Sequence, residues 1–153
     1  MIRRSVPTAL FVVASLAAAG LAFAHSGASG VVRQRMNAMS DIARQMKTIG
    51  LMIMAKQRFH GETAAEAAER IAFHGRRIEE LFPKGTHKRP SEALPAIWAD
   101  WDGFLALSAG LEAKAARLAG AARKADAATE LAAPFKALGG TCRSCHERFR
   151  QKK

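Results

Sequence analysis

Two cysteines and a histidine near the C-terminus have types and spacing that could do chemistry. The segment Cys142-Arg143-Ser144-Cys145-His146 reads C-x-x-C-H. On a helix, positions i, i+3 and i+4 share one face. Both thiols can therefore add to the two vinyl groups on one edge of a haem, and the histidine can reach the iron from the same side. The motif predicts covalent attachment of one haem c.

Three other roles for the two cysteines remain open. A thioredoxin-like dithiol is expected in a βαβ context, with its cysteines at the start of a helix. A simple disulfide would close only a very small loop and would add little stability. A zinc site needs further ligands, but no H-x₃₋₅-H pair exists among the remaining histidines, which are His25, His60, His74 and His87.

The elements that must position this motif are predicted to be helices. Strand signals are almost absent, and apolar residues recur at steps of 3 and 4 in four stretches. These cover residues 31–56, 63–82, a stretch from 91–95 to about 118, and 131–149. Pro83 should stop the second helix, whereas Pro134 either kinks the fourth or lies in its first turn. The pattern predicts an all-α, antiparallel up-down four-helix bundle with haem c on its C-terminal helix.

The first residues are predicted to be a signal peptide, residues 1–24. Arg3 and Arg4 precede an apolar run over 9–21, and Ala22-Phe23-Ala24 follows as an A-x-A cleavage site. The run is shorter than the roughly 20 residues of a membrane-spanning helix, although an uncleaved anchor is the alternative. We therefore expect one four-helix-bundle domain over 25–153, exported to the periplasm, with no membrane span after processing.

The chain resembles the class II cytochromes c, the cytochrome c prime family, over nearly all of 25–153. The haem motif with the following Phe149 and Arg150 lies near the C-terminus of a four-helix pattern, which makes the match specific. Three other segments fit the family: Arg35-x-x-x-Met39, Leu81-Phe82-Pro83 and Leu94-Pro95-Ala96-Ile97-Trp98.

The resemblance implies a role for each residue of the motif. Cys142 and Cys145 would be the thioether attachments, and His146 the proximal axial ligand of the iron. High-spin members leave the sixth position empty and bind gases such as NO or CO. Low-spin members fill it with a methionine of the first helix and carry electrons.

The first helix resembles the low-spin members more closely, so Met39 is predicted as the distal ligand, with Met36 a distant second. The alternative is that Met39 only fills space in the core. The sequence thus favours a single-electron carrier with His/Met ligation, which is not an enzyme. A high-spin gas-binding protein is the first alternative, and a non-haem helical protein with a C-x-x-C dithiol is less favoured.

Arg35 lies on the apolar stripe of the first helix, where an unpaired charge is costly. Pairing with a haem propionate would offset that cost. Alternatively, the side chain reaches water at the end of the bundle. His74 lies on the second stripe and is interpreted as a hydrogen-bonded core histidine.

The chain is basic, with 24 Lys and Arg against 13 Asp and Glu, a formal charge of +11 that processing lowers to +9. Near the haem motif, Glu147 alone opposes six positive charges: Lys136, Arg143, Arg148, Arg150, Lys152 and Lys153. This patch predicts docking of an acidic periplasmic redox partner, although solvated helix faces would show the same charges. Nucleic acid is excluded as a partner, because the chain is expected to be exported and has no motif that recognises nucleic-acid bases. A homodimer is expected from the resemblance alone.

Overall fold

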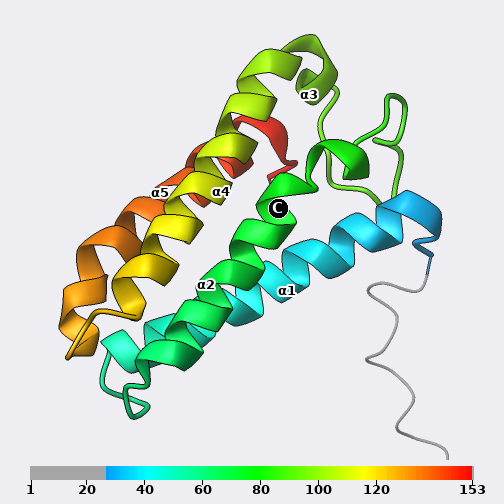
Figure 1. Cartoon of the computed structure of the whole chain (residues 1–153). Helices are drawn as coiled ribbons and strands as arrows, with labels where there is room; N and C mark the ends of the chain where they lie inside the picture. The colour runs from blue at the N-terminus through cyan, green and yellow to red at the C-terminus, as the bar shows by residue number, and fades with distance from the viewer. Residues whose placement is uncertain (1–26, 153) are drawn as a thin grey trace, which may run out of the picture.

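The computed structural model describes residues 27–152, and four long helices dominate it. They are α1 (Gly30–Ile53), α2 (Gly61–Arg76), α4 (Trp101–Ala122) and α5 (Ala132–Phe149). Consecutive long helices run in opposite directions (Figure 1). The all-α four-helix bundle predicted from the sequence is therefore confirmed. The predicted signal peptide, residues 1–24, lies outside the described residues.

Shorter turns of helix connect the long ones. The predicted second helix is in two parts, because α2 ends at Arg76 and a 3₁₀ turn, η2 (Glu79–Leu81), precedes Pro83. The third is also divided, into α3 (Ala96–Ala99) and α4. Asp100 separates them, since its carboxylate accepts a hydrogen bond from the Gly103 N–H at 3.2 Å and caps α4.

The end of α1 and the start of α5 are each determined by the local backbone conformation. Helix α1 stops before the predicted residue 56 because Ala55 has a left-handed φ of 54°. The Lys56 N–H then bonds the Leu51 carbonyl at 2.9 Å, and the Ala55 N–H bonds that of Met52 at 3.1 Å, which is a Schellman cap. After η3 (Ala128–Leu131), Pro134 is the third residue of α5. Its missing N–H costs nothing in the first turn, so it lies there and causes no kink.

Helices α2 and α4 pack closely because small residues line their contact. The buried residues of α2 include Ala64, Ala68 and Gly75. A Cβ on Gly75 would lie 3.0 Å from the backbone nitrogen of Glu112. Helix α1 packs against the other side of α2, and α5 packs against α4.

Helices α1 and α5 are close only at one end. A Cβ on Gly50 would lie 3.4 Å from the Phe135 ring, and one on Gly139 would lie 4.0 Å from Met46 Cε. Toward the other end the two ribbons spread apart (Figure 1). Because the cysteine motif lies on the C-terminal part of α5, it belongs to the spread end.

The C-terminus of α5 is pinned to the segment before α3. The Leu94 N–H donates to the Phe149 carbonyl at 2.9 Å, and the Gln151 N–H donates to the Glu92 carbonyl at 2.8 Å. Phe149 is buried, and its ring lies edge-on to that of Phe104 at 5.5 Å between centroids. No helix in residues 27–152 has both the length and the apolar content to cross a membrane.

Candidate haem attachment site

Helix α5 brings the three residues of the C-x-x-C-H motif together on one face. Cys142 and Cys145 are both free thiols, half-buried, and packed against the apolar core of the bundle. The Cys142 thiol lies 3.6 Å from the Leu138 carbonyl one turn earlier. The two residues between the cysteines are exposed. The chain therefore presents two unoxidised thiols to the interior of its spread end, as thioether attachment requires.

The environment of the thiols keeps them protonated. Burial raises the pKa of Cys142, against the opposing effects of a backbone hydrogen bond and the ammonium of Lys114. Burial and the neighbouring Cys142 raise the pKa of Cys145 to about 11, although Arg148 opposes this. A reactive redox dithiol needs a lowered thiol pKa. These values disfavour the dithiol interpretation.

The imidazole of His146 follows directly on the same face. Partial burial, together with the guanidinium of Arg150, lowers its pKa, while Glu92 opposes the shift. A neutral imidazole keeps a lone pair for a metal ion. Within residues 27–152, no three His, Cys, Asp or Glu side chains gather where they could hold a metal ion by themselves. The donor set, two thiols and one imidazole, thus fits a haem and does not fit zinc.

Lys114 of α4 lies beside this face and was not singled out from the sequence. Its Nζ donates to Thr141 Oγ1 at 2.6 Å, next to Cys142. Lys114 adjoins the buried stripe of α4. Only the packing of α4 on α5 shows that it faces the motif, and no local signal could have found it.

Arg35 is buried, with 6% of its surface exposed, so the expectation that it reaches water is wrong. Its five N–H groups are all used. Nε and Nη2 donate to the Leu81 carbonyl at 3.0 and 2.8 Å. Nη1 donates to the Thr86 carbonyl at 3.1 Å and Ser91 Oγ at 2.8 Å, and Nη2 to Thr86 Oγ1 at 2.7 Å. The guanidinium also lies 3.9 Å from the Phe82 ring centroid.

These contacts show how the buried charge of Arg35 is satisfied within the protein. Burial lowers its pKa to about 10, so the side chain stays charged at neutral pH. The described partners are oxygens of residues 81–91, and no carboxylate is among them. The propionate role of Arg35 stays a prediction, and its structural role as an anchor for this loop was not predicted.

The two methionines considered as distal ligands both lie on α1. Met39 is half-buried and packs against the apolar core, one turn beyond Arg35. Met36 is also half-buried. Neither position decides between an iron ligand and a core residue, so the ligation by Met39 stays a prediction.

His74 bridges α2 to α1 and has no contact with the haem motif. Its Nε2 lies 2.7 Å from Asp41 Oδ2, as the interpretation of a hydrogen-bonded histidine requires. Burial would raise the pKa of Asp41, but the hydrogen bonds with His74 and Gln45 and the charge of Arg44 lower it overall. The pair is a structural link between two helices.

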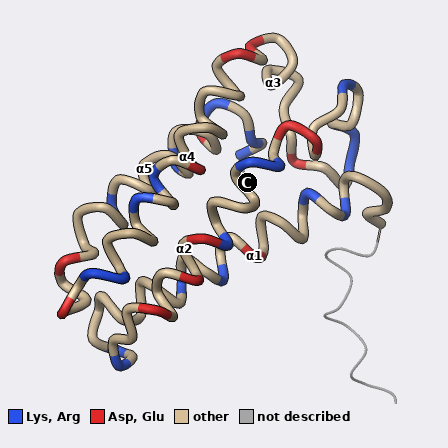
Figure 2. The backbone as a smooth tube through the Cα atoms, viewed as in Figure 1, with Lys and Arg blue, Asp and Glu red and all other residues tan. Residues whose placement is uncertain are grey.

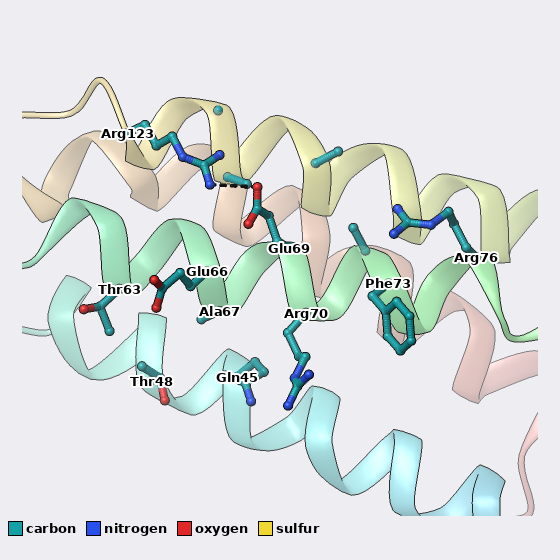
Figure 3. A pocket seen from close by; sticks show the side chains of 14 residues that line it. Gln45, Thr48, Thr63, Glu66, Ala67, Glu69, Arg70, Phe73, Arg76 and Arg123 are labelled. Carbon is teal, nitrogen blue, oxygen red and sulfur yellow. Dashed lines mark hydrogen bonds and ion pairs between the residues drawn. The ribbon is translucent and has the colours of Figure 1, made fainter.

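A groove of about 880 Å³ follows α2 between α1 and α4 (Figure 3). Its edge carries an ion pair between Arg123 Nη2 and Glu69 Oε1, at 2.7 Å. Neither cysteine nor histidine lines it. The groove is therefore separate from the haem attachment site.

The predicted basic patch is partly neutralised. Figure 2 shows Lys and Arg along α5 with acidic residues near its end. Arg148 pairs with Asp100, and Arg150 Nη2 lies 2.5 Å from Glu92 Oε2. Still exposed are Lys136, Arg143 and Lys152, while Lys153 lies outside the described residues.

Comparison with known proteins supports the same assignment. A family model described as Cytochrome C' matches residues 30–150. The chain is 35% identical over 129 residues to a cytochrome c-554 of Cereibacter sphaeroides, covering 80% of this chain and 81% of that protein. It is 33% identical to the cytochrome c' of Rhodospirillum rubrum, covering 92% and 97%.

A solved structure agrees with the sequence comparisons. The cytochrome c' of Rhodopseudomonas palustris superposes with a TM-score of 0.75 at 28% identity, covering 82% of this chain and 99% of that one. Members of the matched family bind a covalent c-type haem with its iron. With the fold, the free thiols and the family match in agreement, this chain belongs to the cytochrome c' family.

Proposed function

We propose that this protein is a periplasmic, high-spin cytochrome c' that binds small gases such as NO or CO at an open distal face of its haem iron. The observation that carries the proposal is the C-x-x-C-H motif with two free thiols on α5 of a cytochrome c' bundle. The A-x-A pattern in the first 24 residues supports export.

Each residue of the motif has a defined task in this proposal. Cys142 and Cys145 each add a thiol across one vinyl group, forming an S–C bond while the thiol proton passes to the vinyl carbon. No oxidant is needed, because adding S–H across a C=C bond keeps all atoms and electrons of the thiol and the vinyl group in the product. The raised pKa values of both cysteines keep the proton on each sulfur at neutral pH. His146, neutral for the reason given above, would hold the iron through a ring nitrogen. When bound, the haem would supply an iron that exchanges one electron and can bind a small ligand.

The comparisons match the cytochrome c' family as a whole and give no support for the low-spin, Met-ligated subgroup that the sequence favoured. The gas-binding alternative fits the matched family better, so it becomes the main proposal. His/Met ligation remains the second candidate because Met39 is half-buried on α1, which lies opposite α5 across the spread end. A thioether is a soft ligand that would favour low-spin iron and electron transfer.

One set of absorption spectra tests these candidates. We expect the purified holoprotein to show a Soret band, a five-coordinate high-spin spectrum in both oxidation states, and a new spectrum when CO is added to the reduced form. The Met39→Ala variant should keep the same spin state, with Met36→Ala as the matched control. A low-spin spectrum that becomes high-spin only in Met39→Ala would establish the second candidate. Absence of a Soret band would favour the dithiol.

We also propose that the exposed cations of α5 dock an acidic redox partner. Lys136 and Arg143 have no ion pair among those described and are exposed on the haem-bearing helix. Such a patch raises the rate of encounter with an anionic partner at low salt. Homodimerisation is a further proposal that rests on the family resemblance.

A further inference from the structure

Lys114 reaches from α4 into the contact of that helix with α5. Leu111 and Leu118, one turn before and one turn after it, are both buried, so the lysine lies at the side of the apolar stripe. A Cβ on Gly110, also one turn earlier, would lie 3.9 Å from Thr141 Cγ2 of α5. The two helices are therefore close at this point, and Lys114 is half-buried between them.

The ammonium of Lys114 is held by a buried hydroxyl. Its Nζ donates to Thr141 Oγ1 at 2.6 Å, and Thr141 is only 5% exposed. Among the ion pairs described for residues 27–152, none involves Lys114. Arg123, at the end of the same helix, instead pairs with Glu69. No described ion pair therefore balances the charge of Lys114, which the fold keeps partly out of water at a cost in free energy.

The charge of Lys114 acts on the haem attachment residue. Thr141 directly precedes Cys142, and Lys114 lowers the pKa of the Cys142 thiol against the larger opposing effect of burial. The ammonium thus lies within electrostatic range of the sulfur that would carry one edge of the haem. Cys142 packs against the apolar core, where charges are screened less than at an exposed surface.

A fixed cation beside a haem favours the reduced iron, because ferric iron carries one more positive charge than ferrous iron. We propose that Lys114 raises the reduction potential of the haem iron, and that Thr141 is the positioning residue that keeps its ammonium beside the attachment site. This inference rests on the proposed attachment of haem through α5. It holds for an open or an occupied distal position, since the charge acts through space.

Three substitutions separate the charge of Lys114 from its packing. Lys114→Gln keeps a hydrogen-bond donor and removes the charge, so we expect a lower midpoint potential in a spectroelectrochemical titration of the holoprotein. Lys114→Arg keeps the charge and should stay close to wild type. Thr141→Val replaces the hydroxyl by a methyl group and releases the ammonium toward water. It should lower the potential by a smaller amount than Lys114→Gln.

Arg117→Gln is the matched control, because it removes the same charge from an exposed position of α4. Its effect should be several-fold smaller than that of Lys114→Gln, and it should vanish at about 0.5 M salt, where exposed charges are screened. The shift caused by Lys114→Gln should persist at that salt concentration. The absorption spectrum of each variant should show the spin state of wild type, because the proposed effect involves no change of iron ligand.

Haem content is measured first in every sample by the pyridine haemochrome spectrum. Wild-type protein without haem would contradict the proposed function itself. In fully loaded samples, a shift in Lys114→Gln no larger than that in Arg117→Gln would overturn the role of Lys114, and so would a changed spin state. A wild-type potential in Thr141→Val would overturn the positioning role of Thr141. If Lys114→Gln cannot be purified with haem, Thr141→Val carries the test, because it retains both the lysine and the total charge.

Discussion

At the scale of single residues, contacts between residues close in the sequence could be predicted. Contacts between residues far apart in the sequence could not. Cys142, Cys145 and His146 lie within one helical turn, so their shared face follows from the helix alone. The partners of Arg35 are 46 to 56 residues away, in a loop with no periodic pattern. The sequence showed that a buried arginine needs partners, and it did not show that oxygens of residues 81–91 supply them.

Loss of the Arg35 side chain should destabilise the holoprotein strongly. Arg35→Leu leaves the Leu81 and Thr86 carbonyls and the Ser91 hydroxyl without their donor, and it removes the contact with Phe82. We expect a loss of about 3 kcal/mol in the free energy of unfolding, measured by urea denaturation. Arg117→Leu, at an exposed position of α4, should change it by less than about 0.5 kcal/mol. Equal effects of the two substitutions would argue against the anchoring role.

At the scale of elements, periodicity located the helices but not every interruption. The four predicted stretches correspond to the four long helices, since apolar stripes at steps of 3 and 4 are what the bundle buries. The breaks near residue 78 and at Asp100 were not predicted. They depend on 3₁₀ turns and on a side-chain cap, which leave the apolar spacing unchanged.

Two helical glycines that look alike in the sequence should respond in opposite ways to alanine. In Gly75→Ala the new Cβ would lie 3.0 Å from the Glu112 backbone nitrogen. Relieving this contact requires a shift of the helix backbone, which costs free energy. We expect a loss of about 2 kcal/mol in the free energy of unfolding. Gly120 has nothing within 4 Å of its Cβ position. Gly120→Ala should therefore stabilise α4 by about 0.5–1 kcal/mol. Both variants are compared with wild type by urea denaturation, and a Gly75→Ala variant as stable as wild type would contradict close α2–α4 packing.

The link between α1 and α2 should depend on pH. The pKa of Asp41 is lowered from 3.8 in the folded protein. The carboxylate therefore stabilises the fold above that value, and its contribution is lost as the pH falls through the lower folded pKa. We expect Asp41→Asn to cost about 1 kcal/mol at pH 7 and progressively less below pH 3.8. Asp126→Asn, at an exposed turn, is the control. A difference between wild type and Asp41→Asn that stays constant down to low pH would contradict this linkage.

At the scale of the whole molecule, the bundle was predicted and its asymmetry was not. Hydrophobic patterning indicates which face each helix buries, and it does not say how far apart two facing helices lie. Small residues such as Gly75 draw α2 and α4 together, while α1 and α5 spread at the end that carries the cysteines. The net charge follows directly from the sequence. The pairing of Arg148 and Arg150 with acidic residues depends on the fold.

The remaining exposed cations should control electron transfer to anions. We expect Lys136→Glu/Arg143→Glu to slow the oxidation of the reduced holoprotein by hexacyanoferrate(III) several-fold at low ionic strength. The effect should disappear at about 0.5 M salt, where charges are screened. Lys56→Glu/Arg58→Glu makes the same charge change in the α1–α2 turn and should slow the reaction much less. Equal slowing by both pairs would show that only net charge matters.

The close packing of α2 on α4 has a consequence for the chain before haem is attached. This contact is built from alanine, glycine and backbone, with Ser108 Oγ donating to the Gly75 carbonyl at 2.9 Å. Nothing in it depends on the cysteine motif. The central pair of helices should therefore form in the apoprotein, before haem is attached.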